Sequence, residues 1–371
     1  MRLGIISQGF SPDKYSGGIG RYYSELIEEL KKKIEIHVFT ETERKNEGNL
    51  FFHSVKPKKI FLPPVNNYLN AKNYSKKFFE KLSELKNEID LVEGPLGMLN
   101  SFHYSKNKFT PLITSIQTPL SEGLTKRSLF LDRKMVYNSE KSIVKNSDAI
   151  VTATNYAKEG IVKDYFRINH PKIVTINQGI STEKFRPMKT EKKFDEPIVL
   201  FVGRIEPRKG LKVLIEAMPF VKEKAKLIVV GEELNQSLPY HREVMDSIER
   251  NSVKEIDFFG YQSEEKLIEL YNKADLIVEP SFSESACYVL IEGMACGKAV
   301  IASSIGGMSE IALKELQFKA GDSRGLAERI DFLLENEGER KNLEKKARER
   351  IVKEYSIKKS AETYFNLYSS F

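Results

Sequence analysis

A short run of glycines and cations forms the first cluster that could do chemistry. Residues 203–210 read Gly-Arg-Ile-Glu-Pro-Arg-Lys-Gly, and they follow an apolar run and precede a stretch with helical spacing. Helix N-termini present free N–H groups and partial positive charge, which suits a phosphate. Arg204 can bind phosphate through two parallel hydrogen bonds, and Lys209 adds a point charge. The cluster is therefore a candidate anion site, with a solvated basic turn as the alternative.

Two carboxylates eight positions apart form the second cluster. Glu284 lies in a loop after an apolar strand, and Glu292 lies in the following helix among apolar neighbours. A carboxylate on such a helix face needs hydrogen-bond partners, and sugar or ribose hydroxyls are suitable donors. The backbone amides of residues 285–288 open this helix and again favour an anion. One capping glutamate and one surface glutamate are the alternative interpretation.

The other reactive residue types show no catalytic pattern. Cys287 and Cys296 form no CxxC motif, and we interpret both as packing residues. The five histidines show no metal-ligand spacing. We therefore expect neither a disulfide framework nor a bound metal.

Both clusters must be positioned by strands that alternate with helices, a pattern that predicts a mostly parallel sheet covered on both faces. The expected strands are 2–7, 34–40, 89–92, 112–116, 149–153, 173–176, 198–202, 225–230, 256–259, 276–278 and 299–302. Helices are expected at 19–33, 210–224, 263–274, 289–296 and 340–371. Ligands of doubly wound sheets bind beyond the carboxyl ends of the strands, which is where both clusters fall.

The length of 371 residues suits two domains. Residues 185–193 are polar and contain a proline, which is typical of a linker, so we place the boundary near residue 190. The expected parts are a first domain over 1–190, a second over 191–353 and a C-terminal segment over 354–371. A cleft between two such domains is where small-molecule sites concentrate.

The composition fits a globular chain, with 40% hydrophobic and 30% charged residues. The sequence has neither a long apolar run nor a signal peptide, so we expect a cytoplasmic protein. Residues 1–190 hold 31 basic and 20 acidic residues, a net charge of +11, and the remainder carries −4. The basic half suits an anionic acceptor or a membrane surface, with a lysine-rich solvated surface as the alternative.

Taken together, the motifs resemble glycosyltransferase family 4. The pattern Gly-Arg-x5-Gly with a lysine before the last glycine, followed by Glu-x7-Glu, is typical of that family. Further similar stretches are 17–20, 177–187, 259–261, 271–275, 294–302 and 306–310. The resemblance covers most of the chain. It implies the α/β GT-B fold, with two Rossmann-like, doubly wound parallel-sheet domains facing each other across a cleft and a C-terminal helix that crosses back to the first domain.

The resemblance also implies the reaction. Such an enzyme is a retaining hexosyltransferase that uses a nucleotide-diphosphate sugar, here a UDP- or GDP-sugar, and needs no metal. The leaving phosphate accepts the proton of the acceptor on the same face of the sugar, so no strong protein nucleophile is required. The absence of an Asp-x-Asp motif from this sequence agrees with that expectation. The acceptor would be a sugar, a glycan or a lipid-linked sugar.

Individual roles follow from the matched motif positions. Arg204 and Lys209 would bind the donor diphosphate, Glu284 would contact the donor sugar, and these three form the predicted catalytic set. Glu292 would hold the ribose hydroxyls. The other predicted donor-binding residues are Gly17, Gly18, Gly203, Gly231, Tyr261, Ser285, Ala286, Cys287, Tyr288 and Val289. The two N-terminal glycines would let the backbone approach the phosphates and the acceptor closely.

Three positions depart from the family pattern. Gln117 stands where a histidine is frequent, and we assign it to acceptor binding because glutamine hydrogen-bonds but does not titrate. Residues 285–287 read Ser-Ala-Cys instead of Gly-Phe-Gly, which places side chains where bare backbone is common. Ser181 replaces an aspartate, a change that we expect to be structural.

Several alternatives stay open. The departures would also suit a weakly catalytic nucleotide-sugar-binding protein, and the fold would suit a phosphorylase that uses free phosphate. A dinucleotide oxidoreductase fits less well, because residues 17–20 stand about ten residues beyond their strand and form no complete GxGxxG. Basic, aromatic segments at 68–86 and 127–141 suit a peripheral contact with the inner face of a membrane, or ordinary surface helices. Nucleic acid is not an expected partner, because the basic excess is dilute.

Overall fold

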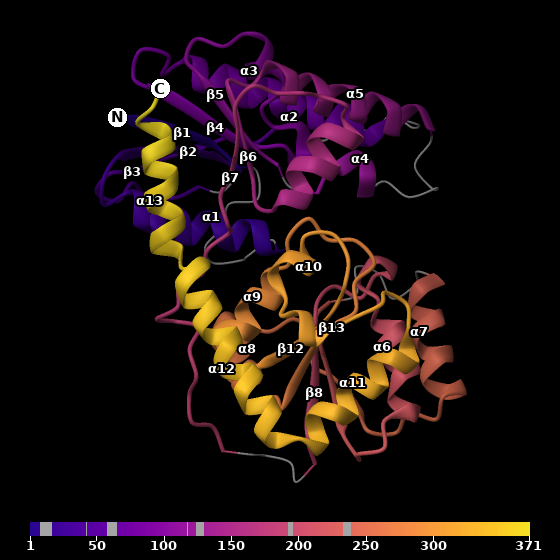
Figure 1. The fold of residues 1–371 in the computed structure, drawn as a ribbon. Coiled ribbons are helices and arrows are strands. Elements are labelled where there is room, and N and C mark those ends of the chain that lie inside the picture. Colours follow the sequence, from indigo (N-terminus) through magenta and orange to yellow (C-terminus); the bar gives the residue numbers. More distant parts are fainter. Residues whose placement is uncertain are drawn as a thin grey trace. The chain divides into compact units, whose positions relative to one another are not determined.

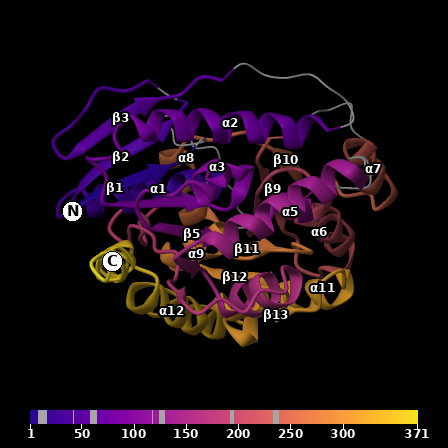
Figure 2. The same cartoon turned by 90° about the horizontal axis from the view of Figure 1, so that it is seen from above.

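The computed structural model describes residues 1–7, 17–41, 43–57, 65–116, 118–123, 130–191, 196–232 and 239–371. The chain divides into two compact units. Unit 1 comprises Met1–Gly179 and Ile357–Phe371, and unit 2 comprises Ile180–Ser356. In each unit, helices cover a central sheet (Figures 1 and 2).

Parallel strands form the sheet of unit 1. They are β1 (Arg2–Ile6), β2 (Glu35–Thr40), β3 (Leu50–Ser54), β4 (Leu91–Pro95), β5 (Leu112–Ile116), β6 (Ala149–Thr152) and β7 (Ile173–Thr175). Their order in the sheet is β3-β2-β1-β4-β5-β6-β7, so the direction of winding reverses between β1 and β4. Strands β1 and β5 are buried along almost their whole length because helices cover both faces of the sheet.

The helices of unit 1 come from both ends of the chain. They are α1 (Gly17–Leu30), α2 (Asn66–Ser83), α3 (Phe102–Lys106), α4 (Leu120–Gly123), α5 (Phe130–Asn146), a π-helical segment (Ala157–Tyr165) and α13 (Ile357–Tyr368). Helix α13 packs beside α1 (Figure 1). The Tyr368 hydroxyl donates to the buried carboxylate of Glu93 on β4, which also accepts a hydrogen bond from Tyr23 on α1. This shared carboxylate fixes the C-terminal helix to unit 1.

Unit 2 repeats the architecture with a smaller parallel sheet. Its strands are β8 (Ile198–Val202), β9 (Lys226–Val230), β10 (Ile256–Phe258), β11 (Leu276–Glu279), β12 (Ala299–Ser303) and β13 (Gln317–Phe318). Its helices are α6 (Leu211–Ala217), α7 (Pro239–Arg250), α8 (Glu264–Lys273), α9 (Tyr288–Ala295), α10 (Met308–Ile311), α11 (Ser323–Glu335) and α12 (Glu337–Glu354). The order β10-β9-β8-β11-β12-β13 reverses between β8 and β11.

The chain changes unit at two points that lie side by side. Ile180 forms a parallel bridge with Ser356, and its amide donates to the Tyr355 carbonyl at 2.8 Å. The segment after Ile180 packs along unit 2, where the Arg348 guanidinium donates to the carbonyls of Thr182, Phe185 and Ala295. The stretch interpreted as a linker from its sequence thus belongs to unit 2 over its described residues.

The predicted fold class, two doubly wound parallel-sheet α/β domains, is confirmed, but some elements differ from the predictions. The strand predicted at 89–92 begins two residues later. The elements that were not predicted are β3, β13, α3, α4, α7, α10, α11 and the π-helical segment. The helix predicted over 210–224 ends at Ala217, because Pro219 has no N–H to continue it and a 3₁₀ turn, Met218–Phe220, follows. The segment 340–371 forms two helices that separate at Tyr355 and Ser356. Within the described ranges, no helix is long and apolar enough to cross a membrane.

Candidate active site

The candidate site lies where the winding of the unit 2 sheet reverses. Strands β8 and β11 are neighbours there, so the loops that follow them emerge side by side at the carboxyl edge of the sheet. The first loop carries residues 203–210 and the second carries residues 280–287, which are the two clusters singled out in the sequence. Ligands of doubly wound folds bind at such a reversal point.

Close backbone contact between neighbouring loops holds this edge together. Gly210 has φ +70°, and a Cβ atom at this position would lie 2.0 Å from the Pro280 carbonyl oxygen. Gly231, after β9, has φ +144°, and its Cβ would lie 1.9 Å from the Gly203 carbonyl oxygen. Only glycine fits at either position. The Phe282 amide also donates to the Arg208 carbonyl at 2.8 Å, so the two loops of the site are joined directly.

Alternating charges connect the two loops. The Lys209 ammonium lies 2.7 Å from Glu284 Oε1, and the Arg208 guanidinium contacts the same oxygen at 2.8 Å. Arg208 also pairs with Glu206 at 3.0 Å, and Arg204 pairs with Glu206 at 3.1 Å. The Arg204 side chain is 54% exposed, whereas that of Lys209 is 13% exposed. A diphosphate could therefore reach these cations by exchanging with the carboxylates that now hold them.

The charge state of Lys209 is fixed by its neighbours. Burial acts to lower the pKa of Lys209, but the negative charges of Glu284 and Glu279 outweigh it and raise the pKa above its ordinary value. The ammonium is thus fully charged at neutral pH, as an electrostatic role toward phosphate requires.

Helix α9 presents its start to the same edge. Cys287 is its N-cap residue, in an extended conformation, and the helix begins at Tyr288. One turn further, Glu292 is 2% exposed, and the Tyr271 hydroxyl donates to its Oε2 at 2.5 Å. The expectation that a carboxylate on this face needs a partner is confirmed, and α8 supplies that partner. Both cysteines are buried, as predicted for packing residues.

The structure brings most predicted site residues to this edge of unit 2. Gly203 and Gly231 directly follow β8 and β9, and Tyr261 follows β10 with 55% of its surface exposed. Ser285, Ala286, Cys287, Tyr288 and Val289 lead into α9. Gly17 and Gly18 belong to unit 1, where they begin α1. Gln117 follows β5 and lies outside the described residues.

Sequence reasoning assigned no role to three charged residues of this cluster. Glu206 and Arg208 lie inside the first motif, but which ion pairs they form depends on the neighbouring loop. Glu279 ends β11 and is wholly buried. The signal that could have found it is a carboxylate directly after the apolar run 276–278. The Cys287 thiol faces Glu279 Oε2 at 3.6 Å, so this side chain is directed into unit 2.

Among the described residues, no three His, Cys, Asp or Glu side chains gather in a way that could hold a metal ion.

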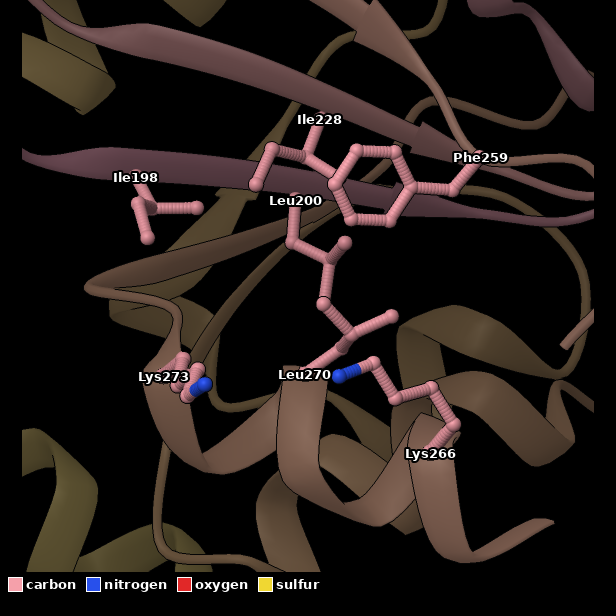
Figure 3. A pocket seen from close by; sticks show the side chains of 7 residues that line it. All are labelled: Ile198, Leu200, Ile228, Phe259, Lys266, Leu270 and Lys273. Atoms are coloured by element: carbon pink, nitrogen blue, oxygen red, sulfur yellow. The ribbon is translucent and has the colours of Figure 1, made fainter. Parts of the chain in front are cut away.

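Unit 2 also has a small pocket that is distinct from the charged cluster. It lies between the sheet and α8, with Ile198, Leu200, Ile228 and Phe259 on one side and three α8 residues on the other (Figure 3). Its two lysines, Lys266 and Lys273, both pair with Glu269, and the lining is otherwise hydrocarbon.

Comparison with known proteins agrees with this architecture. The family model described as Glycosyltransferase Family 4 matches residues 16–184, and the one described as Glycosyl transferases group 1 matches residues 182–350. An N,N'-diacetylbacillosaminyl-diphospho-undecaprenol alpha-1,3-N-acetylgalactosaminyltransferase of Campylobacter jejuni is 27% identical, over 99% of this chain and 98% of that protein.

Solved structures show the same fold. Sucrose-phosphate synthase from Thermosynechococcus elongatus superposes with a TM-score of 0.85 at 21% identity, covering 100% of this chain and 98% of that one. The Anabaena protein HepE in complex with UDP-glucose gives 0.81 at 16% identity, covering 100% of both chains. The fold and these matches define a glycosyltransferase of GT-B type. Within that class, the chain belongs to glycosyltransferase family 4, which confirms the resemblance seen in the sequence.

Proposed function

We propose that this enzyme is a retaining hexosyltransferase that uses a nucleotide-diphosphate sugar, UDP- or GDP-linked, and requires no metal. The acceptor is a sugar, a glycan or a lipid-linked sugar. The observation that carries the proposal is the placement of Lys209 and Glu284 on neighbouring loops at the reversal point of the unit 2 sheet, 2.7 Å apart and beside the start of α9. Cations and helix amides at one point suit a diphosphate.

The geometry supports a mechanism based on leaving-group stabilisation. Negative charge grows on the diphosphate as the bond to the sugar breaks, and Lys209 and Arg204 would neutralise it. Once the diphosphate takes over Lys209, the Glu284 carboxylate keeps only Arg208 as its cation and can accept hydrogen bonds from sugar hydroxyls. The departing phosphate would take the acceptor proton on the same face of the sugar, which gives retention without a protein nucleophile.

The relatives support this assignment of substrates. HepE was solved with UDP-glucose, and the name of the Campylobacter relative specifies a diphospho-undecaprenol-linked acceptor. Glu292 would hold the donor ribose, and Tyr261, exposed after β10, would be a wall of the base pocket. Gly17 and Gly18 keep the proposed role toward the donor phosphates, and Gln117 keeps the proposed role in acceptor binding.

A donor screen in EDTA tests the proposal. One of the UDP-, GDP- or ADP-sugars should raise the unfolding temperature, because at a hundredfold excess over Kd a ligand stabilises the fold by about 2.7 kcal/mol. The same donor should be hydrolysed slowly by the enzyme alone, still in EDTA. Free sugar and nucleotide are measured by chromatography.

Each other outcome favours a different function. Binding without transfer or hydrolysis would identify a nucleotide-sugar-binding protein. Turnover that requires free phosphate would identify a phosphorylase. Activity that EDTA removes and magnesium restores would contradict the metal-free mechanism.

We further propose that the enzyme is cytoplasmic and contacts the inner face of the membrane through the start of α5. Phe130 is 80% exposed and Leu131 is 53% exposed, and Arg133 and Lys134 beside them are also exposed. Exposed apolar side chains next to cations suit an anionic lipid surface.

Helix α2, the other basic segment considered from the sequence, is a weaker candidate. Its apolar side chains Tyr74 and Phe78 are buried within unit 1, and Lys77 and Lys81 pair with glutamates on the same helix surface. The interpretation of this segment as an ordinary surface helix is therefore the one that the contacts favour.

Vesicle flotation tests the contact at α5. Replacing Phe130 and Leu131 together with serine should weaken binding to phosphatidylglycerol vesicles by about tenfold or more, because burying one large apolar side chain contributes about 1.5–3 kcal/mol. Serine at Phe332, which is 43% exposed on α11, should leave binding unchanged. Equal binding by all three proteins, or none by the wild type, would remove this proposal.

A further inference from the structure

The carboxyl group of Glu279 lies beneath the candidate donor site. Its neighbours on β11, residues 276–278, are all apolar. Side chains alternate along a strand, so Glu279 lies on the same face as Ile277, which packs against Gly293 of α9. The Cys287 thiol at the N-cap of α9 donates to Glu279 Oε2 at 3.6 Å. Glu279 therefore lies under the start of the helix that faces the predicted diphosphate.

The hydrogen bonding of this carboxyl group is incomplete. Glu279 is 0% exposed, and within the described part of the chain its Oε1 atom has no hydrogen-bond partner. An enclosed polar atom without a partner is costly, and buried carboxylates in folded proteins are normally paired. A role that requires a titratable group at this position would account for that cost.

Charged groups from two neighbouring elements act on Glu279. Burial raises the pKa of Glu279 to about 7, Lys209 and Arg208 act to lower it, and Glu284 acts to raise it. The hydrogen bond from the Cys287 thiol also lowers the pKa of Glu279, and burial keeps that thiol protonated by raising its own pKa well above the ordinary value. The carboxyl group therefore exchanges its proton near neutral pH.

Binding of a diphosphate to Lys209 would favour the protonated form of Glu279. In the structure, Lys209 acts on two carboxylates, those of Glu284 and Glu279. A diphosphate that takes over Lys209 adds two negative charges nearby, and added negative charge disfavours ionisation of a neighbouring carboxylate. Glu284 lies on a loop and keeps Arg208 as its counter-ion. Glu279 is held by a buried strand, so the response open to it is to accept a proton.

We propose that Glu279 is a proton-exchanging positioning residue of the donor site. As a carboxylate it holds the charge of Lys209 while the site is empty, and it takes one proton from solvent when the donor diphosphate binds to Lys209. The proton returns to solvent when the nucleotide leaves, so Glu279 itself neither consumes nor releases a net proton over a cycle. This inference rests on the proposed function, because it requires that a nucleotide sugar binds at Lys209.

Isothermal titration calorimetry tests the proton uptake directly. UDP-glucose is the probe, or GDP-mannose or ADP-glucose if the donor screen selects one of these, because the diphosphate of a nucleotide sugar does not titrate near neutrality. At pH 7.5, the binding enthalpies measured in buffers of different ionisation enthalpy should reveal uptake of roughly half a proton or more per site. Glu279→Gln should bind the same probe with no uptake.

The affinity for the probe should show the same linkage. Wild-type affinity should be constant well below pH 7, where Glu279 is protonated with or without the probe, and should fall by up to about tenfold per pH unit above it. Glu279→Gln should show no such fall. Glu344→Gln is the matched control, because Glu344 is also a carboxyl group of unit 2 with a pKa raised by burial, but the cation that lowers its pKa most is Lys298 and not Lys209. The control should keep the wild-type linkage.

The possible outcomes separate this inference from the function on which it rests. If no nucleotide sugar binds the wild type, the proposed function fails and this inference fails with it. If one binds without proton uptake, or with uptake that Glu279→Gln retains, the donor site stands and the role of Glu279 is wrong. Proton uptake is measured on the wild type first. The proposal can therefore be contradicted even if the Glu279→Gln protein fails to fold.

Discussion

Replacing Lys209 with alanine should lower the turnover number by at least about tenfold, and by up to 10²–10³-fold if its contact forms fully only as the leaving group departs. Lys209 lies 2.7 Å from Glu284 and is mostly enclosed, so water cannot replace its charge effectively. An interaction that strengthens in the transition state lowers kcat as well as kcat/KM when it is removed. Donor hydrolysis by the purified variant measures both constants.

A second lysine provides the control for this substitution. Lys212 lies in the first turn of α6, where it pairs with Glu216 at 3.8 Å, and Lys212→Ala should leave turnover within the error of the assay. Arg208 still holds Glu284 when Lys209 is absent, so we expect Lys209→Ala to fold. A rise in KM with kcat unchanged would show that Lys209 only binds the donor, and wild-type kinetics would remove it from the site.

Much of this site could be predicted from local sequence, because each part of it follows a strand. The apolar run at 198–202 and the glycine-bounded motif after it predict a strand followed by an anion-binding turn, and the structure contains the strand and a 3₁₀ turn, Pro207–Lys209, after it. The N-cap Ser263 of α8 accepts a hydrogen bond from the Lys266 amide, as the first turn of that helix indicates. Hydrophobic periodicity and helix capping depend on residues close together in sequence, so both can be predicted without knowing the fold.

The pairing of distant loops could not be predicted in the same way. Nothing local to residues 203–210 shows that β8 lies beside β11 and not beside another strand of the sheet. The position of β11 beside β8 explains why Gly210 is required, because the Pro280 carbonyl oxygen occupies the space that a side chain at residue 210 would need. It also decides that Arg208 bridges Glu206 and Glu284. These features are set by the sheet order, which depends on contacts across the whole unit.

Short or partly exposed elements were also missed for a physical reason. Strand β3 keeps most of its side chains partly exposed at the edge of its sheet, and β13 has only two residues. Neither builds enough of a period-two pattern to stand out. Glu279 was missed for a different reason. It ends a wholly buried strand, and no role could be assigned to it before the residues around its side chain were known.

Substitution of Glu292 should reveal whether its carboxylate holds the donor ribose. Glu292→Ala should lower kcat/KM with the normal donor by roughly tenfold or more, because a group that hydrogen-bonds a substrate hydroxyl is lost. The variant should also lose about 1–3 kcal/mol of stability, since the buried Tyr271 hydroxyl loses its acceptor. Stability and kinetics must therefore be measured together, by thermal unfolding and donor hydrolysis.

A donor analogue with a deoxyribose separates the two roles of Glu292. The wild type should discriminate against that analogue by about tenfold or more, whereas Glu292→Ala should accept both donors equally, because the contact that reads the hydroxyl is already absent. Tyr271→Phe keeps the carboxylate and should retain the discrimination. If Glu292→Ala still discriminates as the wild type does, the carboxylate serves Tyr271 and the packing of α8 on α9, and another residue recognises the ribose.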